Sequence, residues 1–290
     1  MRVYFLDRNI ISIIKDSNLN RKQKDRNKLN ILKKLREIDR DGCFITPILS
    51  IMEGEHGKLE DKSKQIEDVI DIEFSELEKF FHNAELDKAF NLLFMKELLV
   101  IGKLGRDYKN NIKNKEEFLS DIRELILNLP KKEKLKERIN QILDIASSYK
   151  LSRDNPMVIA CILSICGEGQ CKKIIKPNKE KYYNAAMDFT HLSIFSFLKS
   201  QFTHTYRRGR KEIVHCKLIT GDIALNNFIK YFDFDSINGD FLPQDFGYYA
   251  TINLSEYGKK KIPDFVKTII LGLWITASVV LSDTCIRQNL

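Results

Sequence analysis

Four acidic residues stand where they could act together on one chemical step: Asp7, Glu53, Asp188 and Asp222. Asp7 directly follows the apolar run 3–6, and Asp222 follows the strand-like run 213–220 by two residues. Clustered carboxylates repel one another unless a cation neutralises them, and hard oxygen ligands select Mg²⁺ or Mn²⁺ rather than zinc. A pair of such ions about 3.5–4 Å apart stabilises both the attacking and the leaving oxygen in phosphodiester hydrolysis.

The elements that must position these acids are predicted from the apolar pattern. Residues 2–7, 43–46 and 213–220 are short runs rich in β formers, and we expect them to form buried strands. A helix that begins near Pro47 carries Glu53, and an amphipathic helix over 182–201 carries Asp188. This order indicates an α/β fold, in which ligand sites lie at the carboxyl ends of parallel strands. We therefore expect Asp7 and Asp222 at one end of the sheet.

The middle of the chain has a different character. Residues 53–87 contain 12 acids and four lysines, with apolar residues at helical spacing from Val69 to Phe81. This pattern predicts an acidic amphipathic helix. Further helices are predicted over 86–104 and over 116–143, the latter interrupted at Pro130. Residues 58–150 thus form a helical region with almost no strand signal.

The segments around the four acids resemble the four motifs of PIN-domain nucleases. VYFLDRNIIS (3–12) resembles the first motif, an apolar strand followed by Asp-x-Asn, and LSIMEG (49–54) resembles the second. NAAMD (184–188) resembles the third motif and LITGDIAL (218–225) the fourth. The resemblance covers residues 1–57 and 155–235. Arg8 departs from it, because the family commonly has a small hydroxyl residue there, and 58–150 has no counterpart in a minimal member.

The resemblance implies an architecture and a set of roles. The fold is expected to be a PIN-like three-layer α/β sandwich with a central, mainly parallel sheet, formed by residues 1–57 and 155–290. Residues 58–154 are then a helical insertion. The resemblance also implies that an Mg²⁺ or Mn²⁺ site is formed by Asp7, Glu53, Asp188 and Asp222.

Three polar residues near these acids have two interpretations. The resemblance implies that Asn9, Asn184 and Thr220 hold the metal-binding carboxylates in place. Asn and Thr are equally suited to helix caps and turns, so that alternative stays open. His191, three residues after Asp188, is interpreted as a packing residue.

The charge balance is compatible with a polyanionic partner. The chain has 48 Lys and Arg against 40 Asp and Glu, a net charge of +8 and a pI near 9.0. Such an excess favours polyanions without proving one, because charge runs usually form solvated faces. A basic loop is predicted to bind nucleic acid, with its tyrosine stacking on an unpaired base. It consists of Tyr206, Arg207, Arg208, Arg210 and Lys211. Residues 15–36 form a second basic segment.

The expected function is hydrolysis of RNA by a metal-dependent endoribonuclease, of the kind found in bacterial toxins and defence effectors. RNA is the expected partner and DNA the less favoured one. A structure-specific DNA nuclease and a non-catalytic nucleic-acid-binding scaffold remain the alternatives. A homodimer or an inhibitor protein is also compatible with the sequence.

Cysteine usage and targeting signals favour a cytoplasmic protein. The six cysteines lack the Cys-x₂-Cys spacing of zinc sites, and most lie in apolar runs as expected of buried free thiols. The amino terminus has no apolar core long enough for a signal peptide. The uncharged run 268–282 has 15 residues, short of the ~20 that a spanning helix needs. We expect it to be a buried segment, with membrane or partner docking as the alternative.

Overall fold

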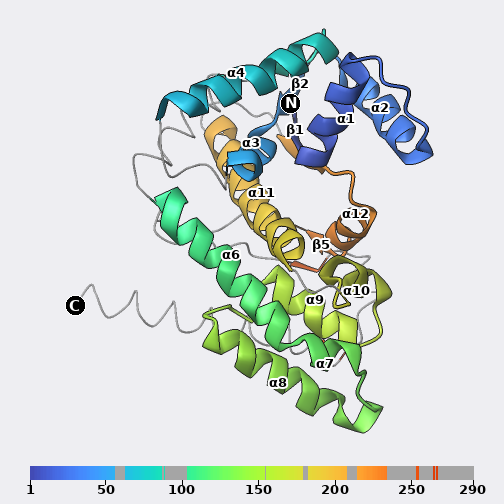
Figure 1. Cartoon of the computed structure of the whole chain (residues 1–290), viewed down its shortest axis with the longest axis vertical. Coiled ribbons are helices and arrows are strands. Elements are labelled where there is room, and N and C mark those ends of the chain that lie inside the picture. The colour runs from blue at the N-terminus through green and yellow to red at the C-terminus, as the bar shows by residue number, and fades with distance from the viewer. Residues whose placement is uncertain are drawn as a thin grey trace. The chain divides into compact units, whose positions relative to one another are not determined.

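A computed structural model of the chain describes residues 1–55, 63–86, 88, 103–153, 155–178, 182–207, 214–233, 253–254, 264 and 266 (Figure 1). The strands are β1 (Arg2–Leu6), β2 (Cys43–Thr46), β3 (Glu85–Leu86), β4 (His215–Ile219), β5 (Phe232–Asp233) and β6 (Asn253–Leu254). The helices are α1 (Arg8–Asn18), α2 (Arg26–Ile38), α3 (Ile48–Glu55), α4 (Ser63–Phe80), α6 (Lys103–Asp121), α7 (Arg123–Leu127), the 3₁₀ helix η1 (Lys132–Lys134), α8 (Leu135–Ser148), α9 (Pro156–Ile165), α10 (Gly169–Ile175), α11 (Tyr183–Arg207) and α12 (Ile223–Ile229).

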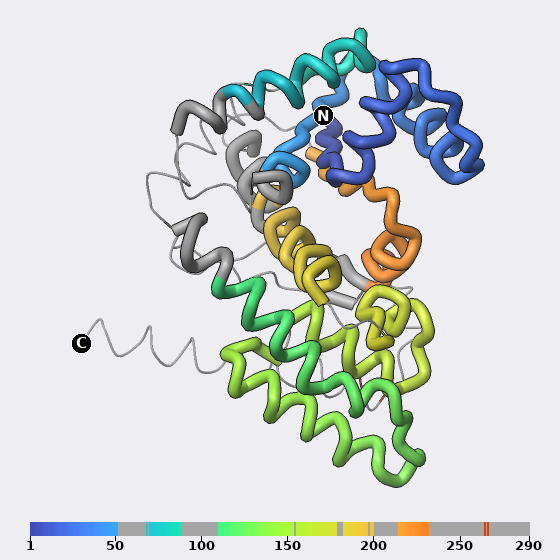
Figure 2. Tube along the Cα trace, in the orientation of Figure 1, coloured from blue at the N-terminus to red at the C-terminus, as the bar shows by residue number. Residues whose placement is uncertain are grey.

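The chain divides into two compact units. The first contains β1 to β4, α1 to α4 and the part of α11 that begins at Thr190. The second contains α7 to α10, the adjoining parts of α6 and α11, and the antiparallel pair of β5 and β6. Figure 2 shows the course of the chain through both units. The helix α4 and strand β3 lie within the predicted insertion 58–154 but belong to the unit with the sheet. The helices α9 and α10 follow that range but belong to the helical unit.

The first unit is built on a four-stranded parallel sheet in the order β3-β2-β1-β4. The central strand β1 pairs with β2 from Arg2 opposite Cys43, and with β4 from Arg2 opposite His215. In this register Leu6 lies opposite Ile219, so β1 and β4 end together. The predicted α/β fold with a parallel sheet is therefore confirmed, and the residues after β1 and β4 leave the sheet at the same edge.

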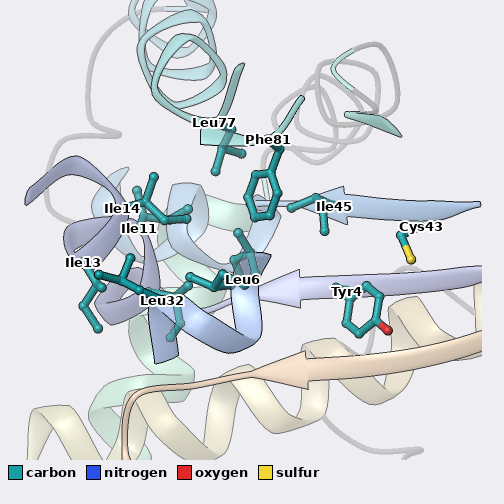
Figure 3. Close-up of a cluster of buried hydrophobic side chains, with 12 residues drawn as sticks. Tyr4, Leu6, Ile11, Ile13, Ile14, Leu32, Cys43, Ile45, Leu77 and Phe81 are labelled. Atoms are coloured by element: carbon teal, nitrogen blue, oxygen red, sulfur yellow. The ribbon is translucent and has the colours of Figure 1, made fainter. Parts of the chain in front are cut away.

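Both faces of β1 are covered, which explains its uninterrupted apolar sequence. Tyr4 and Leu6 face a cluster that includes buried side chains of α1, α2 and α4, drawn in Figure 3. On the other face, the rings of Phe5 and Phe195 of α11 meet edge to face with centroids 5.3 Å apart. The sheet therefore lies between α1, α2 and α4 on one side and α11 on the other.

The predicted acidic helix is α4, and its apolar positions are buried as expected. Its residues Ile70, Phe74 and Leu77 are at most 1 % exposed. Its acidic side forms an ion pair with α1, in which Lys15 Nζ lies 2.8 Å from Glu73 Oε1. Next to this pair, Asn18 Nδ2 donates to Glu76 Oε2 at 2.9 Å.

The strand β3 was not predicted, and a helix from residue 86 was expected instead. Two strand residues are too few to show the alternation on which sequence prediction depends. A long-range contact fixes the position of β3: the carboxylate of Asp39, after α2, accepts the backbone N–H groups of His82, Asn83 and Ala84 at 2.8–3.0 Å. Burial opposes the charge of Asp39, but these three donors outweigh it and hold its pKa below the usual value.

Replacing Asp39 by alanine is expected to lower the free energy of unfolding by about 2 kcal/mol at pH 7, because three amides lose a charged acceptor. The pKa of Asp39 is lowered in the folded state, so its contribution is present above about pH 4 and is lost as the carboxylate protonates in acid. Denaturant unfolding at pH 7 and pH 3 measures this. The exposed neighbour Asp41, changed to alanine, is the control and should leave stability unchanged at both pH values. A penalty equally large at pH 3 would contradict the role of the charge.

The second unit is helical, and its elements begin and end at the predicted signals. Pro130 falls in the break between α7 and η1, as expected. The helix α9 starts at Pro156 behind the cap of Asn155, whose side chain accepts from Met157 N at 2.9 Å. Every residue of α9 is buried, which fits its almost wholly apolar sequence.

The cysteines of the described residues are free thiols, as predicted, and Cys285 lies outside this part of the chain. Cys43, Cys161 and Cys171 are buried, and burial raises the pKa of Cys166 and of Cys216 to about 11. The apolar run 268–282 also lies outside the described residues. Within them, no helix is both long and apolar enough to cross a membrane.

Candidate functional site

Asp7 lies at the carboxyl edge of the sheet and is 5 % exposed. It directly follows β1 and caps α1, since its Oδ1 accepts the N–H of Arg8 at 2.7 Å. Its backbone N–H donates to Ile219 O at 3.1 Å, which extends the pairing of β1 with β4 by one residue. The carboxylate is thus fixed by its own helix and by the neighbouring strand.

Thr220 joins Asp7 to Asp222. Its hydroxyl donates to Asp7 Oδ2 at 2.9 Å and accepts from the backbone N–H of Asp222 at 3.0 Å. Asp222 then begins α12, with its Oδ1 accepting the N–H of Leu225 at 2.9 Å. The Thr-x-Asp segment therefore places two carboxylates at the ends of adjacent parallel strands, as the sequence predicted for Asp7 and Asp222.

Asn9 gives Asp7 a further hydrogen bond, from its Nδ2 to Oδ2 at 3.4 Å. Both Asn9 and Thr220 thus donate to the same carboxylate oxygen, and both are positions that the sequence linked to the acids. Within the described residues three donors reach this buried carboxylate, and their hydrogen bonds compensate for its removal from water.

Two further residues belong to this arrangement although the sequence analysis gave them no role in it. His191 of α11 is 3 % exposed, and its Nδ1 lies 4.0 Å from Asp7 Oδ1. A Cβ built on Gly221 would lie 3.4 Å from the Cβ of Asn9 and 3.9 Å from Cδ1 of Ile31 in α2. His191 was interpreted as a packing residue, since a lone histidine has no distinctive spacing. The glycine between Thr220 and Asp222 was the available signal for close backbone packing.

The remaining predicted residues are described only in part. Glu53 lies in the second turn of α3, after β2 as predicted, but its side chain is outside the described residues. Asp188 is half-buried on α11 and belongs to the second unit, whose boundary runs between Phe189 and Thr190. Asn184, one turn earlier on α11, is exposed. The meeting of Glu53 and Asp188 with Asp7 therefore stays a prediction.

The predicted basic loop begins inside a helix. The helix expected over 182–201 is longer in the structure, because α11 continues to Arg207. Tyr206 and Arg207 therefore belong to the last turn of α11, and the prediction that they lie in a loop is wrong. Their side chains, together with Arg208, Arg210 and Lys211, lie outside the described residues. The binding role of this segment stays a prediction.

The donor set around Asp7 and Asp222 suits a hard cation. Besides the imidazole of His191, the groups present are carboxylate, hydroxyl and amide oxygens, which Mg²⁺ and Mn²⁺ prefer. Within the described residues no three His, Cys, Asp or Glu side chains are grouped closely enough to hold a metal ion. A site with three protein ligands at this edge would therefore include a side chain outside that set, and Glu53 is the predicted one.

Comparison with models of known protein families, with curated proteins and with solved structures gives no match for this chain.

Replacing Thr220 by valine is expected to weaken the binding of Mn²⁺ at this edge by about 10–100-fold in a titration, because residues that orient ligands typically contribute that much. Valine has the shape of threonine but neither donates to Asp7 nor accepts from Asp222 N–H. Serine keeps the hydroxyl, so Thr220→Ser is the matched control and should bind Mn²⁺ within about threefold of the native chain. Equal losses in both variants would show that the methyl packing, not the hydroxyl bridge, is what matters.

Proposed function

We propose that this chain is a metal-dependent nuclease that hydrolyses phosphodiester bonds, with RNA as its substrate. One observation carries the proposal: Thr220 joins Asp7 and Asp222 at the ends of two adjacent parallel strands. In α/β folds this is the edge at which ligands bind. A PIN-like fold and the roles of Glu53 and Asp188 rest on the resemblance of their sequence motifs.

In this proposal some residues of the site would bind the metal ion and others orient the residues that bind it. Asp7 and Asp222, with Glu53 and Asp188, would hold the Mg²⁺ or Mn²⁺. When bound, such an ion provides a more acidic water and a counter-charge for the phosphodiester oxygens. Thr220 and Asn9 fix Oδ2 of Asp7 by donating to it, and the N–H of Arg8 fixes Oδ1. The carboxylate therefore cannot rotate away from the edge of the sheet, and the site needs little reorganisation before it acts.

A non-catalytic scaffold is less well supported. In a protein that only bound polyanions, the charge of Asp7 would repel phosphate at this edge, and its contribution would be limited to capping α1. Asp7 is nevertheless retained at this edge with three donors aimed at it. Negative charge that repels the substrate becomes useful when a divalent cation lies between the two.

The deciding experiment incubates the purified chain with end-labelled RNA and with single-stranded DNA of the same sequence, each with Mn²⁺, with Mg²⁺ and with EDTA. We expect cleavage of RNA with either ion and none with EDTA. Cleavage of the DNA instead would show that the substrate is DNA, and the chain would still be a metal-dependent nuclease. Absence of cleavage of both, with no binding of Mn²⁺ in a titration, would overturn the proposal in favour of a scaffold.

A further inference from the structure

The helix α2 and the loop before it carry basic side chains that ion pairs do not neutralise. Residues 21–40 contain nine basic and three acidic side chains. Several of the basic ones are exposed and have no ion pair within the described part of the chain. The ones nearest the start and middle of α2 are called the α2 basic surface here: Lys22, Lys24, Arg26, Lys33 and Lys34.

Two of the three acids of this region, Asp25 and Asp39, are engaged elsewhere, whereas the third, Glu37, is exposed on α2 three residues after Lys34. Asp25 caps α2, because its Oδ1 accepts the N–H of Asn27 at 2.7 Å. Asp39 accepts three backbone N–H groups after α4. Asp16 of α1 lies 3.0 Å from Arg21 Nη1 and 3.9 Å from Lys28 Nζ, so it serves two other cations. Glu37 offsets one of the five charges, so the α2 basic surface keeps a net positive charge, and its basic members repel one another.

One side of α2 lies against the candidate site. Ile31 of α2 is the side chain whose Cδ1 would be 3.9 Å from a Cβ on Gly221, between Thr220 and Asp222. Lys34 is about 60° from Ile31 around the helix axis, whereas Arg36 is about 140° away. Leu32 and Leu35, which lie between Ile31 and Arg36 around the helix axis, face the core. Lys34 is thus an exposed basic side chain on the side of the helix that borders the Thr220–Asp222 segment. Lys28 is also about 60° from Ile31, but its Nζ lies 3.9 Å from Asp16 Oδ2.

We propose that the α2 basic surface binds the phosphodiester backbone of a polynucleotide strand, with Lys34 as its contact nearest Asp7. The inference rests on the proposed function and names where its substrate lies. Lysine and arginine side chains along a helix and the loop before it neutralise backbone phosphates, with release of counterions. The shared chemistry is that of RNA and DNA backbones, since a phosphate contact does not read the sugar or the base.

An anionic membrane fits this surface less well. An interfacial helix needs a free apolar face to insert into lipid. The apolar face of α2 is occupied, because Leu32 is 8 % exposed and Leu35 is 0 % exposed in the core of the first unit. The exposed Leu29 lies on the Arg36 side of α2, about 160° from Ile31. The basic side chains of α2 therefore have no free apolar face beside them that could insert into a membrane.

The test measures binding in EDTA, so that it does not depend on cleavage. The full chain is titrated into 5′-fluorescent 12-nucleotide RNA and DNA of one sequence, with fluorescence anisotropy as the readout, at several salt concentrations. Lys34→Ala is expected to weaken binding of both strands by about fivefold at 0.1 M salt and to reduce the slope of log K against log salt by about 0.7. Arg36→Ala removes the same charge from the same helix and should change the affinity less than about twofold.

Each outcome separates this inference from the nuclease proposal. Equal weakening by Lys34→Ala and Arg36→Ala would overturn the inference, because net charge rather than position would then explain binding. Binding to phosphatidylserine vesicles but to neither oligonucleotide would overturn it in favour of a membrane. Oligonucleotide binding that depends on Lys34, in a chain that cleaves nothing with Mn²⁺, would support the surface and overturn only the nuclease. Metal-dependent cleavage with binding that is insensitive to Lys34 would support the nuclease and overturn only the inference about the α2 basic surface.

Discussion

Replacing Asp7 by asparagine is expected to abolish phosphodiester cleavage, with a loss of about 1,000-fold or more. Asparagine keeps the shape of the side chain and removes the negative charge that would hold the cation. Because Asp7 is only 5 % exposed, little room remains beside it for another acid to take its place. A loss of this size corresponds to about 4 kcal/mol of transition-state stabilisation.

The surroundings of Asp7 allow asparagine without collapse of the site. Asparagine is a good N-cap, so its Oδ1 continues to accept the N–H of Arg8. Its Nδ2 then faces the hydroxyl of Thr220, which has a second lone pair besides the one used by Asp222 N–H. The side-chain amide of Asn9 can turn its oxygen toward the new donor. Loss of activity therefore reports the loss of charge rather than unfolding.

Cleavage of the labelled RNA with Mn²⁺ measures this effect, and far-UV circular dichroism with a thermal melt checks the fold. Asp144→Asn is the matched control, because Asp144 is exposed on α8 in the other unit and the charge change is the same. The control should cleave as fast as the native chain. Asp7→Asn should also still bind the labelled strand in EDTA, and more tightly, since a repelling charge is gone. Cleavage by Asp7→Asn at a rate within about tenfold of the native rate would contradict the assigned role.

The sequence predicts the central sheet because its signals are local. The strands β1 and β2 are almost wholly apolar, as expected for parallel strands that are buried on both faces, whereas the edge strand β4 has the exposed residues His215 and Lys217. The caps of α1 and α9 are marked by Asp7 and by Asn155-Pro156. By contrast, β3 depends on the contact of Asp39 with the turn after α4, 43 to 45 residues away. Nothing within a short window of sequence indicates such a contact.

In the candidate site, too, residues with local signals were predictable and residues that depend on long-range packing were not. Asp7, Asn9, Thr220 and Asp222 lie next to strand ends, so the pairing of β1 with β4 was enough to bring them together. His191 comes from the middle of a long helix, and which of its faces meets Asp7 depends on how α11 packs on the sheet. Helical periodicity gives a buried face but not the partner of each residue on it. Packing information of this kind is absent from a single sequence.

The second unit contains a residue that breaks the apolar pattern of its own helix. Lys115 of α6 stands three residues after Ile112 and three before Phe118, on the buried side of the helix. It is 2 % exposed, and burial lowers its pKa to about 7. Removing an ammonium group from water disfavours its charged form. In the unfolded chain this lysine stays charged up to about pH 10.4, so burying it on folding costs free energy below that pH.

Replacing Lys115 by methionine is therefore expected to raise the free energy of unfolding more at pH 7 than at pH 10, because the variant has no ammonium group to remove from water. The sign follows from the lowered pKa. Between pH 7 and about pH 10 the unfolded chain binds one proton more at this residue, so stability of the native chain rises by about 1.4 kcal/mol per pH unit from this group. The advantage of the methionine variant should accordingly be largest at and below pH 7 and nearly vanish by pH 10.

Urea unfolding of the native chain and of Lys115→Met at pH 7, 8.5 and 10 measures this difference. The buried thiols also titrate in this range, since burial raises the pKa of Cys161 and Cys166 and their contribution to stability is lost at alkaline pH. Both chains share those thiols, so their effect cancels in the difference. Lys113→Met is the control on the same helix, because its side chain is 72 % exposed and lies 3.5 Å from Glu117. A stabilisation by Lys115→Met that stays constant from pH 7 to pH 10 would show that packing, and not the charge of the buried lysine, is responsible.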